Sequence, residues 1–188
     1  MATSDVVKDM SQTLIDLLKI GTTAGDVRLV SPDDFVGLVG SATSTLSVFL
    51  YRIVVNSELR NAPRRHLPDG TIRRQPLPLE LNYLITAWAG DRDSELRLIG
   101  QTLRTLYDHS ELGPADLHGA SWEAGDTVQL VLDTLPIADH YCIWDANETG
   151  YRLSLPYTAR VIQLTAAALP GPAPVVHADF HVTEKAAP

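Results

Sequence analysis

Two apolar stretches on either side of a basic insertion dominate the hydrophobic pattern of the chain. In Ser47–Asn56 apolar residues occupy both odd and even positions, with Arg52 as the exception. Because successive side chains of a strand point to opposite faces, this pattern predicts a strand covered on both faces. In Leu77–Trp88 the large apolar residues fall mainly on alternate positions, which predicts a strand buried on one face. We therefore expect a long, antiparallel pair of strands joined by an arm over residues 57–75.

Helical spacing of apolar residues recurs at three other places. It covers Asp5–Ile20 and the stretch from Asp91 to His109, and a third, shorter helix is predicted over Leu135–Ala146, where Pro136 suits the first turn. Pro156 cannot donate to a strand ladder, so an edge strand or a bulge is expected there. The remaining strands are predicted at Val27–Val30, Phe35–Val39, Thr127–Leu132 and Tyr151–Thr165.

This order of elements predicts an α+β fold. We expect a mixed, mainly antiparallel sheet, two or three helices packed mainly on one of its faces, and the long basic arm between the two central strands. A length of 188 residues fits one domain, which we assign to residues 1–168. Residues 169–188 are rich in proline and are expected to form an extended tail. Within it, Val175–Val182 suits addition to a neighbour's open sheet edge.

Composition narrows the function classes. The net charge of −8 argues against a chain-wide attraction to nucleic acid or to anionic lipid. The longest apolar runs are too short to span a membrane, and no signal peptide is recognisable. The single cysteine excludes an internal disulfide framework and suits a reducing compartment.

The arm reverses the charge of the rest of the chain. Its only acidic residues are Glu58 and Asp69, and Asp69-Gly70 is a turn signal that predicts a small hairpin at its tip. The arm is either a loop kept soluble by its charge or a docking surface for an acidic partner. Binding to nucleic acid is the least supported interpretation, because no aromatic residues are interleaved with the basic ones. The arginines are Arg60, Arg64, Arg65, Arg73 and Arg74.

Motifs for catalysis and for cofactor binding are scarce. The sequence has no phosphate-binding loop, no dinucleotide-binding glycine motif and no nucleophile elbow. Cys142 follows Asp139 and His140, but neighbours in sequence do not face each other on a helix, so we interpret it as a buried structural cysteine. His177, Asp179 and His181 would share one face of a strand and could hold a divalent metal, although no fourth ligand or supporting residue accompanies them. We expect no enzyme, metal or cofactor.

Four segments in order resemble one family. They are LSVFLYRIVVNSELRN, RRQPLPLELNYLITAWA, SELRLIGQTLRTLYDHSEL and IWDANETGYRLSLPYTARVIQL. Together they are similar to the cap, or tail-terminator, family of phage-tail-like contractile injection systems, from the first helix to about Leu164. The family supplies no catalytic residues, and the positions that match it are structural. These matching positions are Phe49, Tyr51, Arg52, Leu79–Trp88, Trp144, Tyr151, Leu155 and Tyr157.

The resemblance implies an assembly protein. Terminators form a six-fold ring on the end of the inner tube and sheath, stop polymerisation and hold the extended sheath to the tube. The chain is compact beside larger relatives that carry an additional C-terminal domain. We expect it in the bacterial cytoplasm, as part of an assembled particle, with itself, tube and sheath as partners. A small protein-binding adaptor that forms no ring is the alternative.

A ring subunit needs two different surfaces that complement each other. A basic arm on an acidic body is one way to provide them, and the arm is expected to contact acidic surface on an adjacent subunit, the tube or the sheath. The tail is expected to bridge to the sheath by strand addition. The predicted interface residues are Arg60, Arg64, Arg65, Arg73 and Arg74 of the arm and Val175, Val176, Phe180 and Val182 of the tail.

Overall fold

The helices and strands follow the order that hydrophobic spacing predicts. The computed structural model describes residues 5–56, 65–66, 71–73, 76–146, 149–164 and 168–170. Within these ranges the α-helices are α1 (Val6–Gly21), α2 (Arg92–Asp108) and α3 (Ile137–Asp145), and two short 3-10 helices are η1 (Pro32–Asp34) and η2 (Val36–Leu38). The strands are β1 (Asp26–Leu29), β2 (Thr45–Val55), β3 (Arg65–His66), β4 (Thr71–Arg73), β5 (Leu77–Trp88), β6 (Glu111–Leu112), β7 (Val128–Leu132), β8 (Ser154–Leu164) and β9 (Ala168–Pro170).

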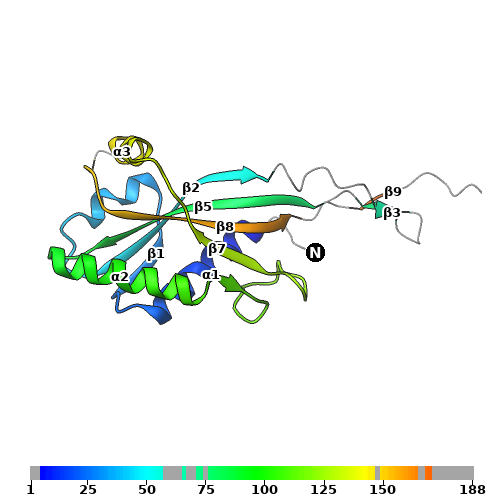
Figure 1. Ribbon diagram of the computed structural model, residues 1–188, viewed down its shortest axis with the longest axis horizontal. Coiled ribbons are helices and arrows are strands. Elements are labelled where there is room, and N and C mark those ends of the chain that lie inside the picture. Colours follow the sequence, from blue (N-terminus) through cyan, green and yellow to red (C-terminus); the bar gives the residue numbers. More distant parts are fainter. Residues whose placement is uncertain are drawn as a thin grey trace, which may run out of the picture.

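One six-stranded sheet organises the body, in the order β1-β2-β5-β8-β7-β6. Strand β1 runs parallel to β2, and the other neighbours are antiparallel. The predicted α+β class, with a mixed and mainly antiparallel sheet, is therefore confirmed. Helices α1 and α2 lie on one face of this sheet and α3 lies on the other (Figure 1).

The larger core fills the space between the sheet and helices α1 and α2. Met10 and Leu14 of α1 and Leu106 of α2 pack in it with Leu81 and Tyr83 of β5, and all five side chains are fully buried. The Tyr83 hydroxyl lies 2.9 Å from the Ser11 hydroxyl, and burial raises the pKa of this tyrosine. This contact satisfies a phenol that would otherwise be buried without a partner.

A second, aromatic core lies on the opposite face, beneath α3. The ring centroids of Trp88 and Trp144 lie 5.8 Å and 5.2 Å from that of Phe35, and the Trp88 indole N–H donates to the Ser47 hydroxyl at 2.8 Å. The strand expected over Phe35–Val39 is wrong, because η2 occupies this segment instead, directly after η1. The 3-10 turns direct Phe35 into the core, which alternation along a strand does not anticipate.

Burial of the central strands differs from the sequence pattern. All of β5 is buried except Leu77 and the half-buried Glu80, so the prediction of one buried face is wrong. Helices cover both faces, and the polar residues that faced away from α1 and α2 find partners: Asn82 donates to Thr158 at 2.7 Å. Strand β2 is buried only over Thr45–Val48, and its later residues are half-buried or exposed, so coverage of both faces over the whole of Ser47–Asn56 is wrong.

Pro156 lies in an interior strand, so the expectation of an edge strand or a bulge at this position is wrong. It pairs with Leu84 of β5, and the register is unbroken on either side of it. The Pro156 carbonyl accepts a hydrogen bond from the Asp133 amide at 2.9 Å, on the side of β7. A residue's N and C=O point to the same side of a strand, so the missing N–H faces the end of β7 and costs no bond to β5.

Strands β3 and β4 of the arm form a second, three-stranded sheet with β9. Strands β3 and β4 are antiparallel, in agreement with the predicted hairpin, whose turn lies outside the described residues. Leu77 pairs with Leu164 in the body and Thr71 pairs with Pro170 in the second sheet, six residues further along the chain on each side. The β4–β9 ladder therefore keeps the register of the outer part of the β5–β8 ladder, Leu77–Leu79, and β3 and β9 lie beyond the far ends of β5 and β8 (Figure 1).

Among the glycines that the structure describes, Gly119 is expected to be the least tolerant of a side chain. Its φ of +91° is strained for other residues, and a Cβ there would clash with the Asp9 carboxylate, which accepts a hydrogen bond from the Ser121 amide at 3.3 Å. Gly119→Ala should lower the free energy of unfolding by roughly 2–3 kcal/mol. Gly40→Ala is the control, because Gly40 has φ of +74° but open space around the Cβ, and about 1–2 kcal/mol is expected. If urea titrations show equal losses in the free energy of unfolding for Gly119→Ala and Gly40→Ala, the predicted clash is contradicted.

Candidate assembly interface

The described residues hold only part of the predicted interface. Arg65 and Arg73 are opposite each other in the β3–β4 pair, at the level of the backbone. The interface role of the whole set stays a prediction. The seven predicted interface residues that lie outside the described residues are Arg60, Arg64, Arg74, Val175, Val176, Phe180 and Val182.

The root of the arm presents two different faces. On the side of α1 and α2, Ile53 and Val55 of β2 are 50% and 37% exposed. On the other side Glu80 accepts a hydrogen bond from Asn56 at 3.0 Å and lies 3.9 Å from Arg160. The sheet thus becomes apolar on one face and charged on the other where it leaves the body.

Cys142 lies on α3, and its exposure differs from the prediction. The cysteine is exposed and free, so the prediction of a buried structural cysteine is wrong. The short helix buries His140 and Trp144, which leaves Tyr141 and Cys142 facing outward. The exposed rings of Tyr141 and Tyr151 stack with centroids 4.6 Å apart.

Other chemistry is limited in the part of the chain that the structure describes. No group of three or more His, Cys, Asp or Glu residues there could hold a metal ion. The candidate ligands His177, Asp179 and His181 lie outside it. None of the helices in the described ranges is long and apolar enough to cross a membrane.

His140 is expected to make stability depend on pH. Burial lowers its pKa below the ordinary value of 6.5. As the pH falls through 6.5, the unfolded chain takes up the proton before the folded chain does, so the free energy of unfolding should decrease. His140→Gln should therefore show a weaker decrease between pH 6.5 and pH 5 than the unmodified chain, in urea titrations at several pH values. Identical pH dependence of the two proteins would contradict this role.

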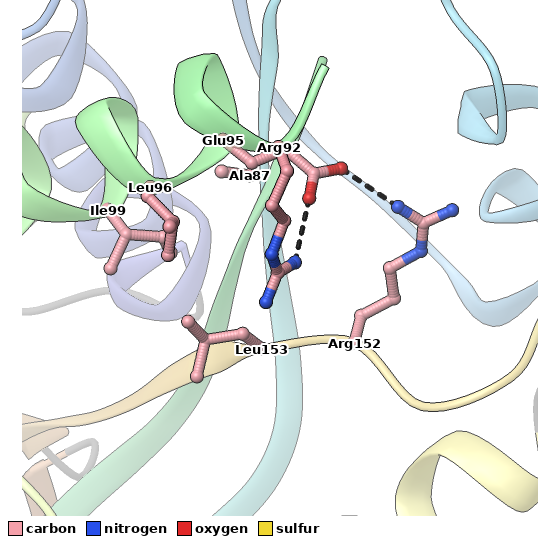
Figure 2. A pocket seen from close by; sticks show the side chains of 7 residues that line it. All are labelled: Ala87, Arg92, Glu95, Leu96, Ile99, Arg152 and Leu153. Atoms are coloured by element: carbon pink, nitrogen blue, oxygen red, sulfur yellow. Dashed lines mark hydrogen bonds and ion pairs between the residues drawn. The ribbon is translucent and has the colours of Figure 1, made fainter. Parts of the chain in front are cut away.

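Glu95 forms two ion pairs at the start of α2 (Figure 2). Its carboxylate accepts from Arg92 at 2.8 Å and from Arg152 at 2.9 Å, through different oxygens. The Arg152 guanidinium also lies 4.8 Å from the centre of a Trp88 ring. Because both oxygens are engaged with arginines, this carboxylate joins α2 to the segment before β8 and is not available as a catalytic acid or base.

An apolar groove lies between α2 and β7. Its volume is about 360 Å³. Two of its lining side chains are strongly exposed, Tyr107 at 80% and Leu132 at 51%. The residues that line it are Leu103, Arg104, Leu106, Tyr107, Ser110, Leu130, Leu132 and Tyr157.

Sequence reasoning missed this groove, although a signal was present. The apolar stripe of α2 includes Leu96 and Tyr107 beside Ile99 and Leu106. Only the latter two are buried. A stripe wider than one sheet face can cover indicates a second apolar surface.

Comparison with known proteins places the fold. The family model for the Pvc16 N-terminal domain matches residues 9–178. The chain belongs to the Pvc16 N-terminal domain family. The match confirms the resemblance to tail terminators and extends past Leu164, into the segment interpreted as an unmatched tail.

Two solved structures share the fold of this Pvc16 N-terminal domain. The first is the sheath/tube terminator, in its extended state, of an extracellular contractile injection system called PVC, with TM-score 0.71 and 21% identity over 99% of this chain and 66% of that chain. The second is the tube-terminating cap of the anti-feeding prophage, with TM-score 0.65 and 22% identity over 97% of this chain and 62% of that one. The chain spans somewhat less than two thirds of the length of these proteins. A search of curated proteins finds no match.

Proposed function

We propose that this chain is a terminator subunit of a contractile injection system. Copies of it, six to a ring, close the end of the inner tube and sheath, stop polymerisation and hold the extended sheath to the tube. The observation that carries the proposal is the agreement of almost the whole chain with a sheath/tube terminator and a tube cap. The chain acts without catalysis, and its partners are further copies of itself, the tube and the sheath. It is made in the bacterial cytoplasm and remains with the particle.

The described surface suits a structural role. The buried carboxylate that would be the first candidate for acid–base chemistry is neutralised by two arginines. The surface instead offers exposed apolar side chains on separate elements, among them Ile53 on β2, Tyr107 on α2 and Tyr141 on α3. Such separated patches are what a subunit with a different neighbour on each side requires.

Electron microscopy of particles from cells with and without this chain tests the proposal. Without the chain, tubes should vary widely in length and many should lack sheath. Restoring the chain from a plasmid should return a single length, which controls for effects on neighbouring genes. Particles of normal length and normal sheath in its absence would refute the terminator function, and a stable monomer in the presence of tube and sheath would favour an adaptor.

A further inference from the structure

The edge of β7 is open where β6 ends. Strand β6 pairs only with Val128 and Gln129, and the Leu130 amide then donates to the Ser110 carbonyl at 2.8 Å. Backbone groups alternate along a strand, and the Asp133 amide, three residues after that of Leu130, faces β8, where it is bonded to the Pro156 carbonyl. The amide and carbonyl of Leu132 therefore point away from β8. Among the described strands, none pairs with this edge beyond Leu130.

The groove between α2 and β7 lies beside this open edge. Leu130 and Leu132 point to the same face of the sheet as Tyr157, toward Leu103 and Tyr107 of α2, and these side chains line the groove. An unpaired strand edge next to an apolar groove is the combination that binds an extended peptide. The edge supplies main-chain hydrogen bonds, and the groove receives alternate side chains of the peptide.

The chain contains a segment with the matching pattern. In Val175–Val182, alternate positions hold Val176, Ala178, Phe180 and Val182, whereas the positions between them hold Val175, His177, Asp179 and His181. As an extended strand this segment has one wholly apolar face and one mainly polar face. The apolar face fits a groove that is itself lined mainly by leucine and tyrosine.

The segment cannot fill the groove of its own chain. Tyr157, which lines the groove, and Pro170, at the end of β9, are thirteen residues apart along the chain, and β9 lies beyond the far end of β8 (Figure 1), so their separation is about 40 Å. From Pro170, Val176 can return by at most about 20 Å, Phe180 by about 36 Å and Val182 by about 43 Å, so only Val182 comes within reach of the groove of its own chain. The whole apolar face can therefore fill a groove only on another molecule, and a second copy of the chain offers one.

We propose that the tail of one copy adds as a strand to the open edge of β7 on a neighbouring copy and inserts Val176, Phe180 and Val182 into the groove between α2 and β7. The proposal rests on the proposed ring, since it needs copies side by side. It assigns the tail to a neighbouring copy, whereas the family resemblance suggests a bridge to the sheath.

A peptide titration tests the contact. The probe is a fluorescent synthetic peptide of residues 171–188, and the receptor is the full chain carrying Phe180→Asp, so that its own tail does not compete. Binding should saturate, and a peptide with Phe180→Asp should bind at least tenfold more weakly. A peptide with Val175→Asp is the matched control: the same change on the opposite face should alter the affinity less than about twofold. Absence of binding up to millimolar peptide, or equal effects of the two changes, would overturn the proposal.

Receptor variants locate the site. Leu132→Asp should abolish binding, and so should Tyr107→Asp, whose side chain is so exposed that folding is not at risk. Ile53→Asp is the control at another exposed strand, the outer part of β2. Loss of binding with Ile53→Asp alone would place the tail on β2 and overturn the proposal, and thermal melts confirm that each variant is folded.

Two outcomes separate this inference from the terminator function. Tubes of uncontrolled length without the chain, combined with no peptide binding, would leave the function standing and remove the inference. Peptide binding at the groove, combined with normal particles in the absence of the chain, would support the tail contact and refute the terminator function. Capture of the peptide by purified sheath but not by the chain would restore the sheath as the tail's partner and overturn the inference.

Discussion

Replacing Arg64, Arg65, Arg73 and Arg74 with glutamate is expected to abolish capping. Each substitution changes the charge by two, so the net charge goes from −8 to −16 and the basic arm becomes acidic. If the arm docks on acidic surface of a neighbouring subunit, tube or sheath, attraction becomes repulsion, and like charges at an interface cost several kcal/mol. Electron micrographs should then show tubes as variable in length as those made without the chain.

A variant with the same net charge distinguishes an effect of charge on the arm from an effect of the total charge of the chain. Lys8, Lys19, Arg28 and Arg97 are exposed on α1, β1 and α2, and their replacement by glutamate also gives −16. This variant should cap normally. Normal capping by the arm variant, or equal failure of both variants, would contradict a docking role for the arm.

Trp88→Ala is expected to have the largest effect on stability, a loss of about 3–5 kcal/mol in the free energy of unfolding. Trp88 is 1% exposed, stacks on Phe35, packs against Trp144 and receives the Arg152 guanidinium on its ring. Its removal empties the centre of the second core and leaves the Ser47 hydroxyl without its indole donor. Urea titrations followed by circular dichroism measure the loss.

Trp88→Phe is the matched control for this prediction. It keeps most of the buried aromatic volume and removes the hydrogen bond, so a loss of about 1–2 kcal/mol is expected. A loss below 1 kcal/mol for Trp88→Ala would show that the aromatic cluster beneath α3 does not stabilise the fold.

The sequence predicts the elements because local pattern and final environment agree for most of them. Helices α1 and α2 each bury one stripe, and Asp91 caps α2 by accepting from the Ser94 amide at 2.8 Å. Strands β1, β2, β5, β7 and β8 each begin and end within a few residues of their predicted limits. The body of the fold, including the order of its elements, could therefore be read from spacing alone.

The errors arise where distant residues decide the environment. Glu80 and Asn82 marked one face of β5 as exposed, because nothing local shows that Thr158 pairs with Asn82 and that α3 covers this face. The tendency of free cysteine to behave as a small hydrophobe places Cys142 inside, yet a nine-residue helix has only one buried side. The groove needs α2, β7 and β8 together, so the helical pattern gives only a surplus of apolar residues as a hint.

The shared register of β4–β9 and β5–β8 has a mechanical consequence. A force applied to the tip of the arm, parallel to these strands, is transmitted to the central strands of the body, β5 and β8. Hydrogen bonds of an antiparallel ladder lie across the strands, so such tension loads many of them in shear at once and does not peel them apart one by one. An arm anchored at its tip would act as a tether that resists sudden force with the strength of the whole sheet.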